Sequence, residues 1–379
     1  MRLTFCAALL CLTTTFVFGQ AADTMRVYRN DKPYEVRDFT RTFSTDRPRN
    51  VILMIGDGMG IAQVFAAMTA NHGRLFLDNF KCVGYSRTQA ANRYITDSAA
   101  GATALSTGKK TYNGAIAMVI DAKGDTVAAK TVLEIAEERG MSTGLVATCA
   151  LSHATPASFI AHQPSRSLYD DIGADYLKTD VDVMIGGGYK NFADRKDGRD
   201  LIAVLKQKGY RVERTMEDIA KVKSGKLAGI TAYAQNPPVH KRDLNLPLST
   251  TTAINILKQN EKGFFLMVEG SQIDWGSHNN NTTHAVSEML DFDQAIGRAL
   301  EFAYEDGNTL IVVTADHETG GMALTGGSMK EGWVRAEYIS GGHTGIVVPV
   351  FAYGPGAEAF MGFIENTDIG NKIIEYVSQ

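Results

Sequence analysis

From Asn50 onward, short apolar runs alternate with segments that have helical spacing. Residues 51–55, 264–268 and 310–313 are continuous apolar runs, which are typical of strands buried on both faces. Longer segments between such runs, with residues 285–304 the longest, have the apolar spacing of amphipathic helices. This alternation predicts an α/β fold with a single doubly wound, mostly parallel central sheet and helices on both faces.

The first residues have a different character. Arg2 is the only charged residue before Asp23, and residues 3–18 are apolar apart from a few threonines. This run is shorter than the roughly 20 residues of a membrane-spanning helix. We therefore expect residues 1–19 to be a signal peptide rather than an anchor, and the cleaved protein to be periplasmic or secreted. The polar, arginine-containing residues 20–48 are expected to form an N-terminal arm before the main domain at residues 49–379.

Charge and cysteine content limit the partners. A formal net charge of −4 gives no basic footprint for nucleic acid, although bound metal ions can still attract anionic substrates. Cys6 and Cys11 lie in the expected signal peptide, which leaves Cys82 and Cys149. These two form either one disulfide in an oxidising compartment or two buried free thiols, and we assign them no chemistry.

Metal-binding side chains follow three of the predicted strands. Asp57 comes directly after the first strand, Glu269 after the strand at 264–268, and Asp316 and His317 shortly after the strand at 310–313. A single Asp after a strand is usually a turn residue. However, ligands of open α/β sheets bind beyond the carboxyl ends of the strands, so three such positions together favour a site.

A second group of candidate ligands lies further along the chain. Asp274 and His278 are four residues apart and can face one way on a helical turn. His343 lies in the glycine-rich loop at 341–345 and offers another imidazole. A carboxylate with imidazoles is a usual zinc ligand set. The remaining histidines lack such company, and we interpret them as surface or hydrogen-bonded residues: His72, His162, His240 and His284.

Ser98 begins a run of small residues compatible with a helix. Asp97 or Ser98 can cap that helix through a side-chain oxygen. A serine at this position lies in the positive field of the helix start, where a negative oxygen is favoured. The two interpretations are a nucleophilic serine and an ordinary capped helix, and the stretch taken alone favours the capped helix.

Five motifs occur together in one order. They are Ile55-Gly56-Asp57-Gly58-Met59-Gly60, Thr96-Asp97-Ser98-Ala99-Ala100-Gly101-Ala102-Thr103-Ala104, Val268-Glu269-Gly270, Thr314-Ala315-Asp316-His317 and Gly342-His343-Thr344-Gly345. The ordered set resembles that of the alkaline phosphatase family and covers the chain from about Asn50 onward. The resemblance implies an alkaline phosphatase-like fold, a catalytic domain at 49–379, and hydrolysis of phosphate monoesters through a phosphoserine.

The resemblance also implies a role for individual residues. Ser98 matches the serine that is phosphorylated, and Arg166 matches the arginine that binds the phosphoryl oxygens. The implied metal ligands are Asp274, His278 and His343 for a first zinc, Asp57, Asp316 and His317 for a second zinc, and Thr155 and Glu269 for a third, magnesium-type site that shares Asp57. By local sequence alone, Arg166 is better explained by a surface salt bridge with Asp170 or Asp171.

Two positions depart from the enterobacterial pattern of the family. His153 replaces an aspartate two residues before Thr155, and Trp275 replaces a lysine after Asp274; other family members resemble this chain at both. Tryptophan can donate only one indole N–H. Histidine near the third site favours Zn²⁺ or Co²⁺ over Mg²⁺, which prefers oxygen ligands. The expected cofactors are two Zn²⁺ and one Mg²⁺, with Co²⁺ or Zn²⁺ as alternatives at the third site.

Other functions fit parts of this pattern. A phosphodiesterase or sulfatase on the same scaffold is one alternative, and a non-catalytic exported protein that binds phosphate or metal is another. Arg166 suits a dianionic group with free oxygens, which favours monoesters. No stretch of the sequence indicates a leaving-group pocket, so we expect broad use of small phosphate monoesters. The family resemblance suggests a homodimer.

Overall fold

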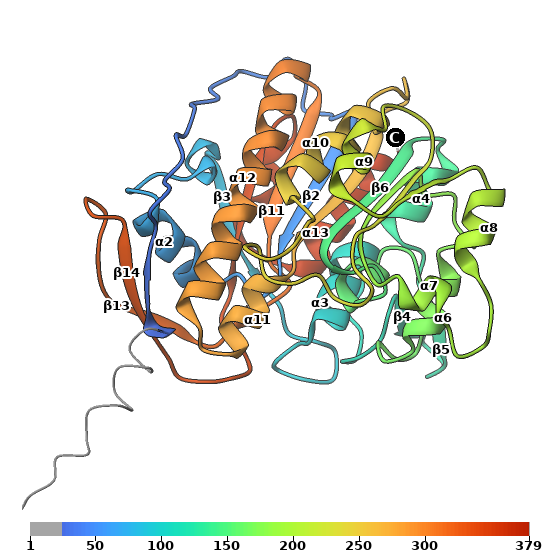
Figure 1. Cartoon of the computed structure of the whole chain (residues 1–379), viewed down its shortest axis with the longest axis horizontal. Helices are drawn as coiled ribbons and strands as arrows, with labels where there is room; N and C mark the ends of the chain where they lie inside the picture. Colours follow the sequence, from blue (N-terminus) through green and yellow to red (C-terminus); the bar gives the residue numbers. More distant parts are fainter. Residues whose placement is uncertain (1–24, 379) are drawn as a thin grey trace, which may run out of the picture.

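The computed structural model describes residues 25–378 of the chain. Its centre is a ten-stranded sheet of order β17-β3-β16-β11-β2-β10-β6-β7-β9-β8 (Figure 1). Within this sheet β16 pairs antiparallel with β11 and β3, and the other neighbouring strands pair in parallel. The predicted α/β fold with a mostly parallel central sheet is confirmed.

The central sheet consists, in chain order, of β2 (Asn50–Gly56), β3 (Cys82–Arg87), β6 (Ser142–Ala150), β7 (Val183–Gly187), β8 (Arg211–Glu213), β9 (Leu227–Ile230), β10 (Phe264–Gly270), β11 (Thr309–Thr314), β16 (Val348–Tyr353) and β17 (Gly362–Glu365). Smaller sheets are formed by β1 (Val27–Arg29), β13 (Met322–Ser328) and β14 (Trp333–Tyr338), by β4 (Met118–Ile120) and β5 (Thr126–Ala128), and by β12 (Glu318–Thr319) and β15 (His343–Thr344).

Helices cover both faces of the sheet. One face is packed by α2 (Ile61–Ala70), α9 (Met216–Lys221), α10 (Leu246–Leu257), α11 (Gln272–His278) and α12 (Thr282–Asp306). The other face is packed by α3 (Ser98–Thr107), α4 (Val132–Glu138), α5 (Ala154–Ala157), α6 (Tyr169–Asp175), α7 (Lys190–Ala193), α8 (Leu201–Gln207) and α13 (Asn366–Val377). Two 3₁₀ turns complete the set, η1 (Phe76–Asn79) and η2 (Ala357–Phe360).

Strand β2 shows why the apolar runs are continuous. Ile52 and Met54 belong to the core on the α12 side, whereas Leu53 and Ile55 belong to the core on the α3 side. Successive strand residues point to opposite faces, so a strand covered on both faces needs apolar residues at every position. Each such side chain contributes about 1.5–3 kcal/mol through burial.

Helix α10 begins at a side-chain cap. The side chain of Asn245 accepts a hydrogen bond from the backbone N–H of Leu248. Pro247 lies in the first turn, where a missing N–H costs nothing. Strand β9 precedes this helix in the chain and is buried in the sheet.

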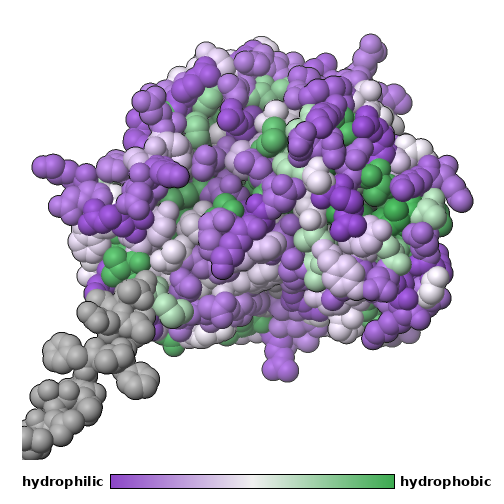
Figure 2. Space-filling view, in the orientation of Figure 1, coloured by the Kyte–Doolittle hydropathy of each residue, from purple (hydrophilic) through white to green (hydrophobic). Residues whose placement is uncertain are grey.

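Several contacts anchor the N-terminal segment to the rest of the described chain. Strand β1 pairs with β14 in the three-stranded sheet, and the Tyr34 hydroxyl donates to Asp293 on α12 at 2.6 Å. The expected signal peptide at residues 1–19, with Cys6 and Cys11, lies outside the described residues. Within residues 25–378 no helix is long and apolar enough to cross a membrane. The face drawn in Figure 2 is mostly hydrophilic, with smaller apolar patches between.

Candidate active site

Three adjacent strands bring ligand-type side chains to one edge of the sheet. Strand β2 lies between β10 and β11, and its end is in register with theirs: Ile55 pairs with both Glu269 and Thr314. His317 Nε2 lies 3.5 Å from Asp57 Oδ1 and 3.2 Å from Asp316 Oδ2. All three side chains are fully buried. We call Asp57, Asp316 and His317 the buried cluster.

A second cluster lies beside the first and is open to solvent. Helix α11 carries Asp274 and His278 on one turn, and β15 carries His343. Nε2 of His278 lies 3.1 Å from Nε2 of His343 and 3.3 Å from Asp274 Oδ1. The His278 side chain is 35% exposed. We call these three residues the solvent-facing cluster.

The two outer histidines are oriented by backbone carbonyls. Nδ1 of His278 donates to the Gly341 carbonyl at 2.7 Å, and Nδ1 of His343 donates to the Thr96 carbonyl at 2.9 Å. These bonds place a proton on each Nδ1, so the two Nε2 atoms, 3.1 Å apart, are the ring atoms that a metal ion could take. Metal-binding histidines commonly have this arrangement.

Ser98 lies at the start of α3, next to the buried cluster. Its Oγ is 3.2 Å from His317 Nε2. Asp97 is the cap, since its side chain accepts from the backbone N–H of Ala100 at 3.0 Å. Gly101 allows this close approach, because a Cβ there would lie 2.9 Å from the Asp316 carbonyl oxygen. The Ser98 oxygen thus lies both at the start of α3 and next to the His317 imidazole.

Arg166 reaches the serine segment rather than its own neighbours. Its Nη1 donates to Asp97 Oδ2 at 3.0 Å, and its Nη2 lies 3.4 Å from His153 Nε2. The alternative salt bridge with Asp170 or Asp171 is therefore wrong. Tertiary folding, not local sequence, decides the partner of this arginine.

A third cluster lies next to Arg166, and it includes Cys149, to which the sequence alone assigned no role. Ligand-type atoms of Cys149, His153 and Glu269 lie within 4.8 Å of one another, and all three residues are buried. Thr155 is also fully buried, in α5 directly after His153. Trp275 packs edge-on against His153, with ring centroids 5.9 Å apart. Cys149 lies near the end of β6, six positions before Thr155.

The negative charges of the carboxylates in this region are unfavourable without a cation, because the groups are buried and lie close to one another. Burial is the largest cause that raises the pKa of Asp57, Asp316 and Glu269, and neighbouring carboxylates raise each further. Several buried atoms that could coordinate a metal have no hydrogen-bond partner among the described residues. They are both Oδ atoms of Asp57, Asp316 Oδ2, Glu269 Oε1, Thr155 Oγ1 and His153 Nδ1. Oxygen and imidazole donors collected in this way fit bound metal ions.

The decisive comparison is at the level of the family. A family model described as alkaline phosphatase matches residues 48–339, more than half of the 379-residue chain. This chain belongs to the alkaline phosphatase family. It is 37% identical to alkaline phosphatase 4 of Bacillus subtilis, over 86% of this chain and 88% of that protein. Its identity to the alkaline phosphatase of Escherichia coli is 33%, over 86% and 85% of the two chains.

A solved structure gives the same result. The alkaline phosphatase of the Antarctic bacterium TAB5 matches with a TM-score of 0.81 at 40% identity, over 88% of this chain and 99% of that one. The predictions of an alkaline phosphatase that hydrolyses phosphate monoesters and binds metal are confirmed at this level.

In this phosphatase the imidazoles differ in charge state. Burial lowers the pKa of His317, and burial followed by the charge of Arg166 lowers the pKa of His153 to about 3. Both rings are therefore neutral at physiological pH. In contrast, the hydrogen bond to Asp274 raises the pKa of His278 to about 9, so a metal ion there displaces a proton.

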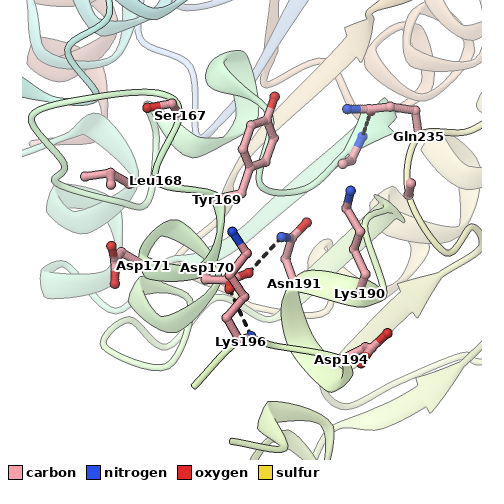
Figure 3. Close-up of a pocket in the computed structure, with 12 residues that line it drawn as sticks. Ser167, Leu168, Tyr169, Asp170, Asp171, Lys190, Asn191, Asp194, Lys196 and Gln235 are labelled. Carbon is pink, nitrogen blue, oxygen red and sulfur yellow. Dashed lines mark hydrogen bonds between the residues drawn. The ribbon is translucent and has the colours of Figure 1, made fainter. Parts of the chain in front are cut away.

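A pocket of about 610 Å³ lies beside the Arg166 segment of the phosphatase (Figure 3). Its wall includes Ser167, Tyr169 and Asp170, which follow Arg166, and also Gln235, whose side chain accepts from the Ala150 N–H at 2.6 Å. None of the residues that line it belongs to the three clusters. The ligand-type chemistry thus lies at the strand ends and not in this pocket.

Proposed function

We propose that the enzyme hydrolyses small phosphate monoesters in two steps through a phosphoserine at Ser98. The observation that carries this proposal is the position of Ser98 Oγ, at a helix start and 3.2 Å from His317. In the first step the serine oxygen loses its proton to solvent and bonds to phosphorus, while the bond to the alcohol oxygen breaks and the departing alkoxide takes up a proton from solvent. In the second step water cleaves the phosphoserine and releases inorganic phosphate.

The residues of the first two clusters supply the metal sites for this reaction. Asp274, His278 and His343 would hold one Zn²⁺; Asp57, Asp316 and His317 would hold the second. When bound, such ions act as Lewis acids that stabilise negative charge on the attacking and leaving oxygens. The solvent-facing cluster suits the side from which alcohol leaves and water enters, because His278 is 35% exposed.

Arg166 would bind the phosphoryl oxygens. Its planar guanidinium can donate two parallel hydrogen bonds to a group with free oxygens. Asp97 holds one edge of the guanidinium at 3.0 Å and so orients the other donors. A dianionic monoester uses this fork better than a diester, which has fewer free oxygens.

Glu269 and Thr155 would hold a third ion together with Asp57. Their unpartnered oxygens suit Mg²⁺, whereas the nearby His153 suits Zn²⁺ or Co²⁺. A structure of the similar TAB5 alkaline phosphatase, 40% identical, is of a histidine-to-glutamate mutant with magnesium bound in its M3 site. We expect activity to differ after reconstitution with zinc alone, zinc plus magnesium, and zinc plus cobalt; equal activities would contradict this assignment.

The organisation of the chain completes the proposal. Residues 1–19 would be removed on export to the periplasm or medium, residues 20–48 would form the arm, and residues 49–379 the catalytic domain of a homodimer. Mass determination of the exported protein tests the cleavage, and light scattering tests the dimer.

Substrate class is tested with three esters of one chromogenic alcohol. The purified, zinc-loaded enzyme is compared on a phosphate monoester, a phosphate diester and a sulfate ester. We expect the monoester to react fastest and to release inorganic phosphate in proportion to alcohol. Faster turnover of the diester or the sulfate would favour a phosphodiesterase or sulfatase, and release of no phosphate would favour a binding protein.

A further inference from the structure

Cys149 lies inside the third cluster, and its thiol faces a proposed metal ligand. Its Sγ is 3.3 Å from Glu269 Oε2 and 3.3 Å from the Ala150 carbonyl oxygen. The residue is on β6, and β10, which carries Glu269, is the next strand of the sheet. The side chain is fully buried. The thiol is therefore fixed at the site by the sheet itself.

A second observation indicates that this place takes a ligand. Cys149, His153 and Glu269 each offer a ligand-type atom, and these atoms lie within 4.8 Å of one another. Glu269 Oε1 and Thr155 Oγ1 are buried without a hydrogen-bond partner among the described residues. Buried polar atoms are normally paired, so unpaired ones beside a thiol indicate a missing positive partner.

We propose that Cys149 is a thiolate ligand of the third metal site, together with Glu269, and that the site therefore takes Zn²⁺ or Co²⁺ in preference to Mg²⁺. The inference rests on the proposed function, which places a metal at Glu269 and Thr155. Coordination breaks the S–H bond, forms a metal–sulfur bond and releases one proton to solvent. No oxidant or reductant is needed.

The preference follows from ligand softness. Thiolate sulfur binds zinc and cobalt well, whereas magnesium demands oxygen ligands in an octahedral arrangement. The cluster offers two such donors, the Cys149 thiol and the His153 imidazole, whose Nδ1 is buried without a hydrogen-bond partner among the described residues. Sulfur is the softer of the two, so its coordination strengthens the preference for zinc or cobalt.

The competing account is that Cys149 is a small buried apolar residue, as many free cysteines are. That account predicts no metal–sulfur bond. X-ray absorption at the zinc edge of the fully loaded wild-type enzyme separates the two accounts without any substitution. We expect a zinc–sulfur distance of about 2.3 Å. A spectrum that needs only nitrogen and oxygen neighbours would overturn the proposal.

The absorption spectrum of the cobalt-loaded enzyme shows which cysteine supplies the sulfur ligand. We expect a sulfur-to-cobalt charge-transfer band that is retained in Cys82→Ser and lost in Cys149→Ser. Cys82 is a matched control because it is also a free cysteine of the central sheet, on β3, outside the three clusters. A band that persists in Cys149→Ser would overturn the assignment, as would its absence from the wild type.

Metal preference and activity are measured on the same samples. With zinc and magnesium present together, we expect Cys149→Ser to bind one magnesium in place of one zinc per chain. Unchanged zinc content in a folded variant would contradict the stated preference. A metal–sulfur signal without monoester hydrolysis would refute the proposed function and leave this inference standing. Monoester hydrolysis without a metal–sulfur signal would refute this inference and leave the proposed function standing.

Discussion

The buried and solvent-facing clusters have similar ligands but different surroundings. His317 and the two aspartates of the buried cluster are fully inaccessible, whereas His278 in the solvent-facing cluster is 35% exposed. The His317 and His343 rings stack between the clusters, with centroids 3.5 Å apart. The difference suggests a division of roles: the buried cluster serves the serine oxygen, and the solvent-facing cluster serves the alcohol and water.

The strongest test of this division is the removal of a buried ligand. We expect Asp316→Ala to lower kcat/KM by at least about a thousandfold, an order more than the loss of an outer-shell partner. It should also reduce bound zinc by one ion per chain, as measured by elemental analysis. Near-normal activity with full zinc content would remove the buried cluster from the mechanism. A thermal unfolding curve checks that the variant is folded.

Removal of a solvent-facing ligand should have a smaller and reversible effect. We expect His278→Gly to lower kcat/KM by about a hundredfold, the upper end of the range for residues that contact a metal ligand, because water can take the place of an exposed ligand. Added imidazole should restore part of the activity, because this cluster is open to solvent. The matched variant His317→Gly should not be rescued, since its site is closed. Equal rescue of both variants would contradict the comparison.

Removal of Arg166 should weaken binding of the phosphoryl group without affecting metal binding at either cluster. We expect Arg166→Ala to lower kcat/KM by about tenfold to a hundredfold, somewhat less than the loss of a fully buried charge-stabilising donor. Zinc content should stay at the wild-type level. Inhibition by inorganic phosphate should weaken in parallel, because the same hydrogen bonds hold the product. Unchanged phosphate inhibition would argue that Arg166 does not bind the phosphoryl group.

Substitution of His162, a histidine outside the three clusters, should have the smallest effect on the protein. Its Nε2 lies 3.0 Å from Glu134 Oε1 in a partly buried pair. The hydrogen bond that the His162 ring donates to the Glu134 carboxylate is the main cause that raises the pKa of His162. Because the folded-state pKa is raised, the pair stabilises the protein below about pH 6.5 and loses its effect as pH rises through the folded-state pKa.

We therefore expect His162→Gln to cost less than about 1 kcal/mol of unfolding free energy at pH 6 and less still at pH 9. Denaturant unfolding at the two pH values measures this difference. Metal content and kcat/KM should match the wild type. A loss of bound zinc in this variant would show that metal binding extends beyond the three clusters.

The central strands and the buried and solvent-facing clusters could be predicted from the sequence for local reasons. A strand buried on both faces needs a continuous apolar run, and β2 and β10 show one. Ligands at strand ends converge because parallel strands end at one edge. Asp274 and His278 converge because one helical turn separates them. These inferences need no knowledge of distant contacts.

The missed elements depend on tertiary contacts. Helix α13 contains Gly370, a poor helix former, and the glycine is needed because a Cβ there would lie 2.6 Å from the Ala104 carbonyl oxygen. Strand β1 exists through its pairing with β14, far along the chain. Cys149 could not be assigned a role because its neighbour Glu269 lies 120 positions away, in the adjacent strand.

Trapping of the phosphoenzyme tests the central claim most directly. The zinc-loaded enzyme is mixed with a chromogenic monoester, quenched in acid and digested, and the peptide that contains Ser98 is analysed by mass spectrometry. We predict phosphate on Ser98 in the wild type, with a burst of released alcohol, and neither in Ser98→Ala. A full burst in Ser98→Ala, or phosphate on another residue of the wild type, would contradict the account.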